Sequence, residues 1–223
     1  MNKNEFADYL SLKVQLYLAP TGFSYVKSKH AFLKKNKDGW VRISFGFYQF
    51  ADTNNFNISF EVRINAIEAM VVKYVDINPS DHKNMSTVKF ILSTLLGYKY
   101  KDGKFEFTTS EALDEIIEKE VVPFLQQKVP FYTGEYSKLE NIYKLYTDPE
   151  EENYKLIHFG YNTCIRTLII GNSLFPDGFD NVIKICESRM MALKQKWPGI
   201  YDMELFDTHF HKIALSLKGQ VFN

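Results

Sequence analysis

Two stretches of this chain alternate strictly between apolar and polar side chains, and this pattern restricts the fold more than any other feature. Every second side chain is apolar in residues 41–47 and again in residues 56–64. Successive strand residues point to opposite faces of a sheet, so a period of two gives each strand one buried face. One buried face and one polar face are typical of antiparallel sheets, so the stretches predict two antiparallel strands over a core. The apolar positions are Val41, Ile43, Phe45, Phe47, Phe56, Ile58, Phe60, Val62 and Ile64.

Polar segments beside these strands predict the turns. Asp38 and Gly39 form a strong signal for a two-residue hairpin, so residues 24–36 are expected to pair with the first strand as one upstream strand. Residues 52–54 supply the next turn. The result is an antiparallel meander of three strands, with His30 on its inner face.

A second hairpin is predicted further along the chain. Residues 86–96 alternate again, and residues 101–103 (Lys-Asp-Gly) turn the chain toward a short strand around Phe105 and Phe107. This hairpin either extends the meander or packs beside it.

Helical spacing dominates both ends of the chain. One capping box is expected at Thr108 with Glu111, and Pro123 should kink the helix that follows it. Asp148 and Pro149 combine an N-cap with a proline at the first helical position. The predicted helices cover residues 3–19, 66–76, the segment after 108, 137–146, the segment from 149 to Gly171, 178–196 and 203–218.

These elements predict an α+β fold, in which an antiparallel β-meander and a second hairpin pack with an N-terminal helix and a largely helical C-terminal half. We expect a meander subdomain over residues 1–108 and a helical subdomain over residues 109–223. The two are expected to share one core as a single domain.

Composition restricts the classes of function. The chain has 223 residues, of which 45% are hydrophobic and 16% aromatic, so it has ample apolar surface for a core. Its 27 basic residues equal its 27 acidic residues, which leaves no global field to attract nucleic acid or an anionic membrane. No run approaches the ~18 apolar residues of a membrane span, and the acidic N-terminal segment differs from a signal peptide. We therefore expect a cytoplasmic protein without a membrane segment.

The two cysteines, Cys164 and Cys186, fall on apolar faces of predicted helices. Such positions favour buried free thiols in a reducing compartment over the alternative of a disulfide. We expect both thiols to be free.

The histidines are the first candidates for chemistry. His209 and His211 are two residues apart, which places them on opposite faces of a helix and excludes a shared metal. Asp207 and His211 share a face, but charged residues at that spacing usually form a solvated surface. His82 follows Asp81 in a loop without a third partner nearby in sequence, and His158 is expected at the edge of a packed helix face. With no nucleophile elbow, P-loop or Gly-x-Gly-x-x-Gly, the sequence predicts no catalytic residue, no metal site and no cofactor.

The strongest candidate surface is the polar side of the meander. Pairing through Asp38 and Gly39 sets Lys35 opposite Arg42 and Lys29 opposite Tyr48, which gathers basic residues and one aromatic. The second turn leaves two registers open, with either Arg42 or Ser44 opposite Arg63. The predicted binding residues are Lys27, Lys29, Lys35, Arg42, Tyr48 and Arg63.

Two interpretations of this surface remain open. Lysines on an edge strand deter aggregation between sheet edges, which needs no partner. Alternatively, the surface docks an acidic protein. Nucleic acid is disfavoured, because few exposed aromatics are available for base stacking and Glu61 interrupts the basic patch.

The N-terminal third resembles bacterial domains of unknown function, in which a helix and a Gly-Phe pair precede a three-strand meander. The resemblance covers residues 6–65. It rests on the helix, Pro20-Thr21-Gly22-Phe23, the lysine-rich strand, the aromatic strand 40–47 and the strand 56–63. Some such domains are encoded beside secreted toxins as immunity proteins. The resemblance thus implies a small cytosolic binding protein and supplies no catalytic residues.

Two classes of function follow. The first is a non-enzymatic protein-binding or immunity-like module, favoured because no motif for chemistry is present. The second is an enzyme with a dispersed active site in a cleft between sheet and helices, to which His82, Asp207 or His211 would contribute. A pocket of desolvated titratable groups would favour the enzyme, and an exposed patch would favour binding.

Overall fold

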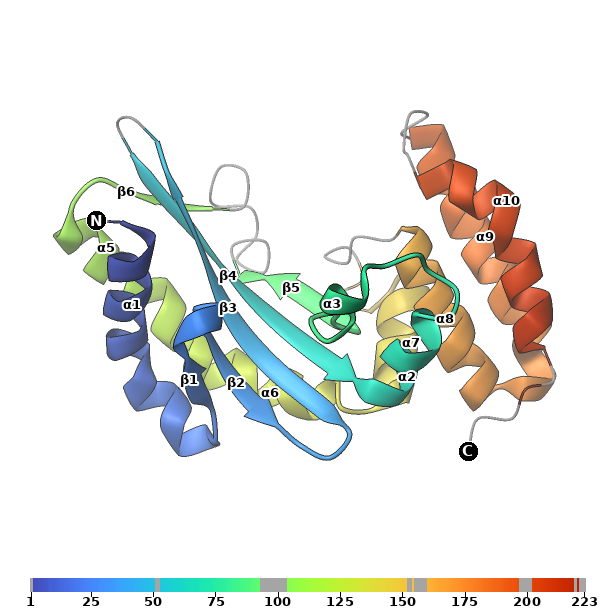
Figure 1. Ribbon diagram of the computed structural model, residues 1–223, viewed down its shortest axis with the longest axis horizontal. Helices are drawn as coiled ribbons and strands as arrows, with labels where there is room; N and C mark the ends of the chain where they lie inside the picture. The colour runs from blue at the N-terminus through green and yellow to red at the C-terminus, as the bar shows by residue number, and fades with distance from the viewer. Residues whose placement is uncertain are drawn as a thin grey trace. The chain divides into compact units, whose positions relative to one another are not determined.

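The computed structural model describes residues 2–50, 53–92, 104–151, 154, 160–196, 202–218 and 220. The chain divides into two compact units that interleave along the sequence: Met1–Arg63 joins Val88–Ser137, and Ile64–Thr87 joins Lys138–Asn223. The predicted α+β class is confirmed, because an antiparallel sheet in meander order is combined with many helices (Figure 1). The predicted boundary at residue 108 and the shared core stay predictions.

The sheet of the first unit runs in the order β1 to β5, and β6 also pairs with β4. One end of β4 pairs with β6 and the other with β5, and both pairings are antiparallel. The two strands expected as a second hairpin therefore run in the same direction, each beside β4. The turn predicted at residues 101–103 lies outside the described residues. The strands are β1 (Ser24–Val26), β2 (Ala31–Lys35), β3 (Gly39–Gln49), β4 (Asn54–Ile64), β5 (Val88–Ile91) and β6 (Phe105–Phe107).

The prediction of one continuous strand over residues 24–36 is wrong. β1 and β2 form a hairpin of their own, joined by the 3₁₀ turn η2 (Lys27–Lys29). His30 ends this turn with a φ of 46°, in the left-handed region that a strand residue does not adopt. The backbone therefore reverses at the place where period two predicts an extended chain, and His30 belongs to the reversal.

The predicted register of the next hairpin is also wrong, by two residues. Lys35 pairs with Trp40 rather than with Arg42. The Oδ1 atom of Asn36 accepts a hydrogen bond from the Asp38 N–H at 2.9 Å, which starts the turn earlier and lengthens it. Because the shift is even, the side chains of β2 and β3 keep their predicted faces.

Aromatic rings form the core of the first unit on one face of the sheet. Helix α1 (Lys3–Leu18) confirms the helix predicted over residues 3–19 and begins at a capping box made by Asn2 and Glu5. It places Phe6 against Phe47 with ring centroids 4.7 Å apart. Further along the same face, the centroid of the Tyr132 ring lies 5.4 Å from that of Phe90.

The helix that follows β6 is longer than expected and changes its winding. Thr109 rather than Thr108 is the N-cap, since its side chain accepts from the Ala112 N–H. Pro123 has no N–H to donate, and π-helical turns lie on both sides of it. The segments are α5 (Ser110–Ile116), η4 (Ile117–Val121), η5 (Phe124–Lys128) and α6 (Val129–Glu135).

Helices make up the second unit. α7, α9 and α10 agree with the predicted segments to within about two residues, which is the usual uncertainty at helix ends. α2 ends at Val71, five residues before the end predicted at residue 76, and α3 is a short helix in the segment predicted as a polar loop. The helices are α2 (Asn65–Val71), α3 (Pro79–His82), α7 (Leu139–Thr147), α8 (Tyr161–Leu174), α9 (Phe179–Lys196) and α10 (Asp202–Leu217).

The helix predicted from residue 149 to Gly171 corresponds to α8, which begins and ends later in the sequence. Asp148 instead caps α7 by donating its N–H to the Lys144 carbonyl, and α8 begins at Tyr161. Gly171, predicted as a stop, lies inside α8. A Cβ atom there would lie 2.5 Å from Val182 Cγ1, so the glycine allows Val182 of α9 to approach.

Both cysteines are buried and free, as predicted. The Cys186 Sγ lies 3.8 Å from the Cys164 carbonyl oxygen, and burial raises the pKa of the Cys164 thiol. Within the described ranges, no helix is both long enough and apolar enough to cross a bilayer.

Candidate functional site

The candidate site lies on the side of the sheet that faces away from the aromatic core of the first unit, here called the outer face. Strand alternation and the observed pairings assign its members. Charged side chains gather where β2, the start of β3, the end of β4 and β5 meet. The outer face comprises Leu33, Lys35, Trp40, Arg42, Ser44, Gly46, Tyr48, Asn55, Asn57, Ser59, Glu61, Arg63, Lys89, Ile91 and Glu106.

The structure places four of the predicted binding residues on this face, with Lys35, Arg42 and Arg63 at its charged end and Tyr48 at its far end. Lys27 and Lys29 lie instead on the turn η2, outside any strand. The Lys27 Nζ forms an ion pair with Asp8 of α1 at 2.7 Å. Sequence reasoning missed Lys89, although its alternation with Val88 and Phe90 marks it as an outward residue.

Arg42 meets an acidic partner rather than a basic one. Its Nη2 lies 2.5 Å from the Glu61 Oε2, and its guanidinium stacks on the Trp40 ring with a centroid distance of 4.5 Å. Lys89 lies on the other side of the same carboxylate, with its Nζ 3.8 Å from the Glu61 Oε1. Glu61 therefore relieves the repulsion that a pairing of Arg42 with Arg63 would create.

The far end of the outer face is aromatic. The Lys104 Nζ lies 4.6 Å from the centroid of the Tyr48 ring and 6.0 Å from that of Phe50. A Cβ atom on Gly46 would lie 2.4 Å from the Asn57 Oδ1 and 3.3 Å from the Tyr48 hydroxyl. Gly46 therefore lets both side chains lie across the strand, which covers its backbone as an aromatic neighbour does for other strand glycines.

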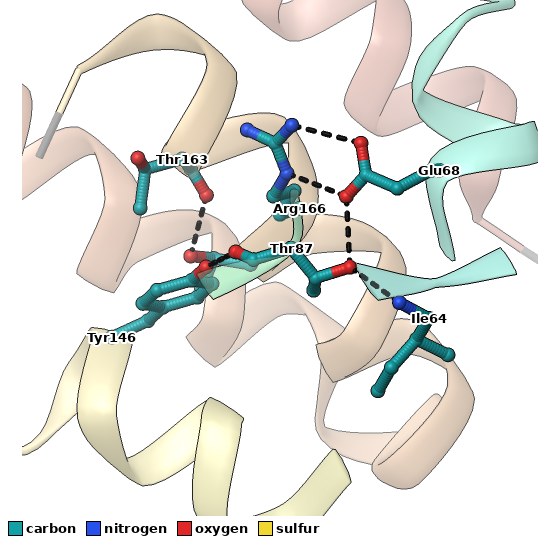
Figure 2. A network of polar contacts seen from close by, with 7 residues as sticks. Ile64, Glu68, Thr87, Tyr146, Thr163 and Arg166 are labelled. Atoms are coloured by element: carbon teal, nitrogen blue, oxygen red, sulfur yellow. Dashed lines mark hydrogen bonds and ion pairs between the residues drawn. The ribbon is translucent and has the colours of Figure 1, made fainter. Parts of the chain in front are cut away.

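The second unit contains a buried polar network that sequence reasoning did not find (Figure 2). Arg166 of α8 donates its Nε and Nη2 to the two carboxylate oxygens of Glu68 in α2, each at 2.8 Å. The Thr87 hydroxyl donates to the Glu68 Oε1 and accepts from the Ile64 N–H, both at 2.9 Å. The carboxylate is thus fully partnered in the interior.

Tyr146 of α7 closes this network. Its hydroxyl donates to the Thr87 carbonyl, and its own carbonyl accepts from Arg189 of α9. Burial raises the pKa of the Tyr146 phenol well above its ordinary value, so it stays a neutral donor and is no base at neutral pH. The Arg189 guanidinium also lies 4.0 Å from the centroid of the Tyr154 ring, and burial lowers its pKa. These contacts tie helices together and expose no reactive group.

The residues suggested for a dispersed active site pair elsewhere. Asp207 forms an ion pair with Lys194 at 3.1 Å, and His211 lies 3.6 Å from Glu187, so each joins α10 to α9 at the surface. The His82 Nε2 lies 2.8 Å from the Ile77 carbonyl oxygen. His158 lies outside the described residues. Across the part of the chain that is described, no group of three or more His, Cys, Asp or Glu side chains has the geometry of a metal site.

Comparison with protein-family models, with curated proteins and with solved structures gives no match. The function is therefore argued from the residues of this chain, and the resemblance to bacterial domains of unknown function stays an expectation.

Proposed function

We propose that this protein is a non-enzymatic module that binds an acidic protein partner through the outer face of its sheet. The observation that carries the proposal is the position of the cations. Lys35, Arg63 and Lys89 lie on the same face as Arg42, whose charge Glu61 already balances. The four cations on this face outnumber its two carboxylates, Glu61 and Glu106. An acidic surface would supply the complement.

The position of these strands argues against edge protection as the whole explanation. β1 is the edge strand on this side, and its residues Ser24, Tyr25 and Val26 carry no charge. Lys35 lies on β2 beyond the end of β1, which pairs only with Ala31–Leu33, so edge protection explains both Lys35 and Lys89 of the edge strand β5. It does not explain Arg42, because β3 lies inside the sheet between β2 and β4. The position of Arg42 favours a binding role.

The groups with strongly shifted pKa values support binding rather than chemistry. Tyr146 and Cys164 are buried among helices of the second unit, and burial is the main cause that raises each pKa. A catalytic group needs access to a substrate as well as a tuned pKa. No observation on the described residues therefore favours the alternative of a dispersed active site. An immunity-like role, with a toxin as the acidic partner, is one case of the proposed function.

Site-specific photo-crosslinking in living cells tests this proposal. A photoreactive residue at Lys35 or Lys89 should yield a covalent adduct with a protein, because both side chains are exposed on the outer face. The same residue at Gln127, exposed on η5, is the control and should yield none. Adducts should disappear when Arg63→Glu is added. Equal adducts at all three positions, or none on the outer face, would contradict the proposal.

A further inference from the structure

We infer that Glu61 is an internal counterion with which the acidic partner competes, and that it limits the affinity of the outer face. This inference rests on the proposed function and concerns the same site. It makes Glu61 a determinant of affinity and names Arg42 and Lys89 as the cations that the partner engages. The inference also assigns a role to Lys89, which was not among the binding residues predicted from the sequence.

The arrangement around Glu61 supports competition. The Glu61 side chain is only 5% exposed and bridges two cations on neighbouring strands. Its contact with Arg42 is close at 2.5 Å, whereas the Lys89 Nζ at 3.8 Å lies beyond hydrogen-bond distance. Lys89 is 54% exposed, so its ammonium group faces water and can meet a second carboxylate.

Arg42 is held in position by more than its carboxylate. The indole of Trp40 supports one side of the guanidinium, and the Arg42 side chain is 14% exposed. A guanidinium held against an aromatic ring stays oriented when its ion-pair partner weakens. Loss of the negative charge at Glu61 should therefore leave Arg42 in place and able to meet a carboxylate of the partner.

The spacing of the cations fits a protein segment in an extended conformation. Lys89 lies directly opposite Glu61, and Arg63 follows Glu61 by two residues on the same side of β4. Arg42, Arg63 and Lys89 thus lie around Glu61 on three neighbouring strands, so an extended segment that crosses β3, β4 and β5 can bring acidic side chains near them. A peptide can leave the positions beside Glu61 and Glu106 uncharged, whereas both carboxylates would repel the continuous charge of a nucleic acid.

The test compares two isosteric variants of the full chain that change its net charge equally. Glu61→Gln removes the counterion beside Arg42, and Glu106→Gln removes a carboxylate from the far end of the same face. The probe is a short fluorescein-labelled peptide of alternating glutamate and serine, and fluorescence anisotropy at low salt measures its binding. We expect Glu61→Gln to tighten binding about fivefold and Glu106→Gln to change it less than about twofold.

Lys89→Gln is a second variant that tests the same inference. Its folding is not at risk, because Lys89 is a surface residue. It should weaken binding about threefold to fivefold. Equal effects of Glu61→Gln and Glu106→Gln would show that only net charge matters and would overturn the inference. So would unchanged binding by Lys89→Gln, or tighter binding of a single-stranded oligonucleotide of equal charge than of the peptide.

The outcomes separate this inference from the proposed function. Protein adducts at Lys35 and Lys89, combined with equal behaviour of the two glutamate variants, would leave the function standing and remove the role of Glu61. Absence of adducts on the outer face would remove both.

Discussion

Arg166 holds both carboxylate oxygens of Glu68 at 2.8 Å, although 98 positions separate the two residues in the sequence. Neither side chain has significant access to water. An ion pair in such a place stabilises the fold only while it is complete, because the loss of one partner leaves a buried charge. The Thr87 hydroxyl and the Ile64 N–H extend the same network, so several segments of the second unit depend on it.

Arg166→Met should therefore lower the free energy of unfolding by about 3–5 kcal/mol. Urea denaturation followed by circular dichroism measures this loss. The double variant Arg166→Met with Glu68→Leu should lose less than the single one, because no unpaired charge is left. If the double variant loses as much free energy of unfolding as the single one, or more, the unpaired buried charge is not the cause of the loss.

Gly171→Ala should destabilise the protein by about 1–3 kcal/mol, because the new methyl group would overlap both methyl groups of Val182. Gly134→Ala is the matched control in another helix. A Cβ atom there has nothing within 4 Å, so this change should stabilise by roughly 0.5–1 kcal/mol. Thermal unfolding of both variants gives the comparison. Addition of Val182→Ala should restore part of the loss in Gly171→Ala; if it does not, overlap with Val182 is not the cause.

Two substitutions at His30 test the left-handed backbone between β1 and β2. Both His30→Asn and His30→Val remove the imidazole, but asparagine accepts a φ near 46° and a β-branched residue does not. The valine variant should be less stable than the asparagine variant by about 1–2 kcal/mol. Equal free energies of unfolding would indicate that residues 24–36 tolerate the continuous strand that their alternation suggests.

Tyr146 should make stability depend on alkaline pH. Its pKa is raised in the folded protein, so the folded state keeps a proton that the unfolded state loses above its ordinary value of 10.0. Stability from this group is complete below that pH and decreases as the pH rises above it, by at most about 1.4 kcal/mol per pH unit. Urea unfolding at several alkaline pH values should show a shallower decrease for Tyr146→Phe than for the wild type. Parallel curves would exclude Tyr146 as a source of the dependence.

The parts of the fold that sequence reasoning found are those with a strong local signal. α1 has a regular apolar face, burial alternates along β3, and the apolar side chains of β4 alternate in sequence although Ser59 and Glu61 between them are buried as well. Apolar periodicity marks the face that packs on the core, so this assignment does not depend on the pairing register of the strands. The outer-face assignments of Lys35 and Arg42 also survived, because the register error was even.

The errors arose where a side chain or a distant element decides the backbone. Asn36 turns the chain through its own side chain, and Val182 keeps Gly171 inside a helix. Neither effect changes hydrophobic periodicity. Glu68 and Arg166 gave no signal either, because each stands alone on its helix and only the folded chain brings them together.

The interleaved division of the chain sets an order of events during synthesis. The chain leaves the first unit after Arg63, returns at Val88 and leaves again after Ser137. A ribosome adds about 5–20 residues per second, so the 98 positions between Glu68 and Arg166 take roughly 5–20 s. Throughout that time the Glu68 carboxylate has no guanidinium to receive it and must stay hydrated. The segment 64–87 is therefore among the first parts of its unit to be synthesised and among the last that can be buried.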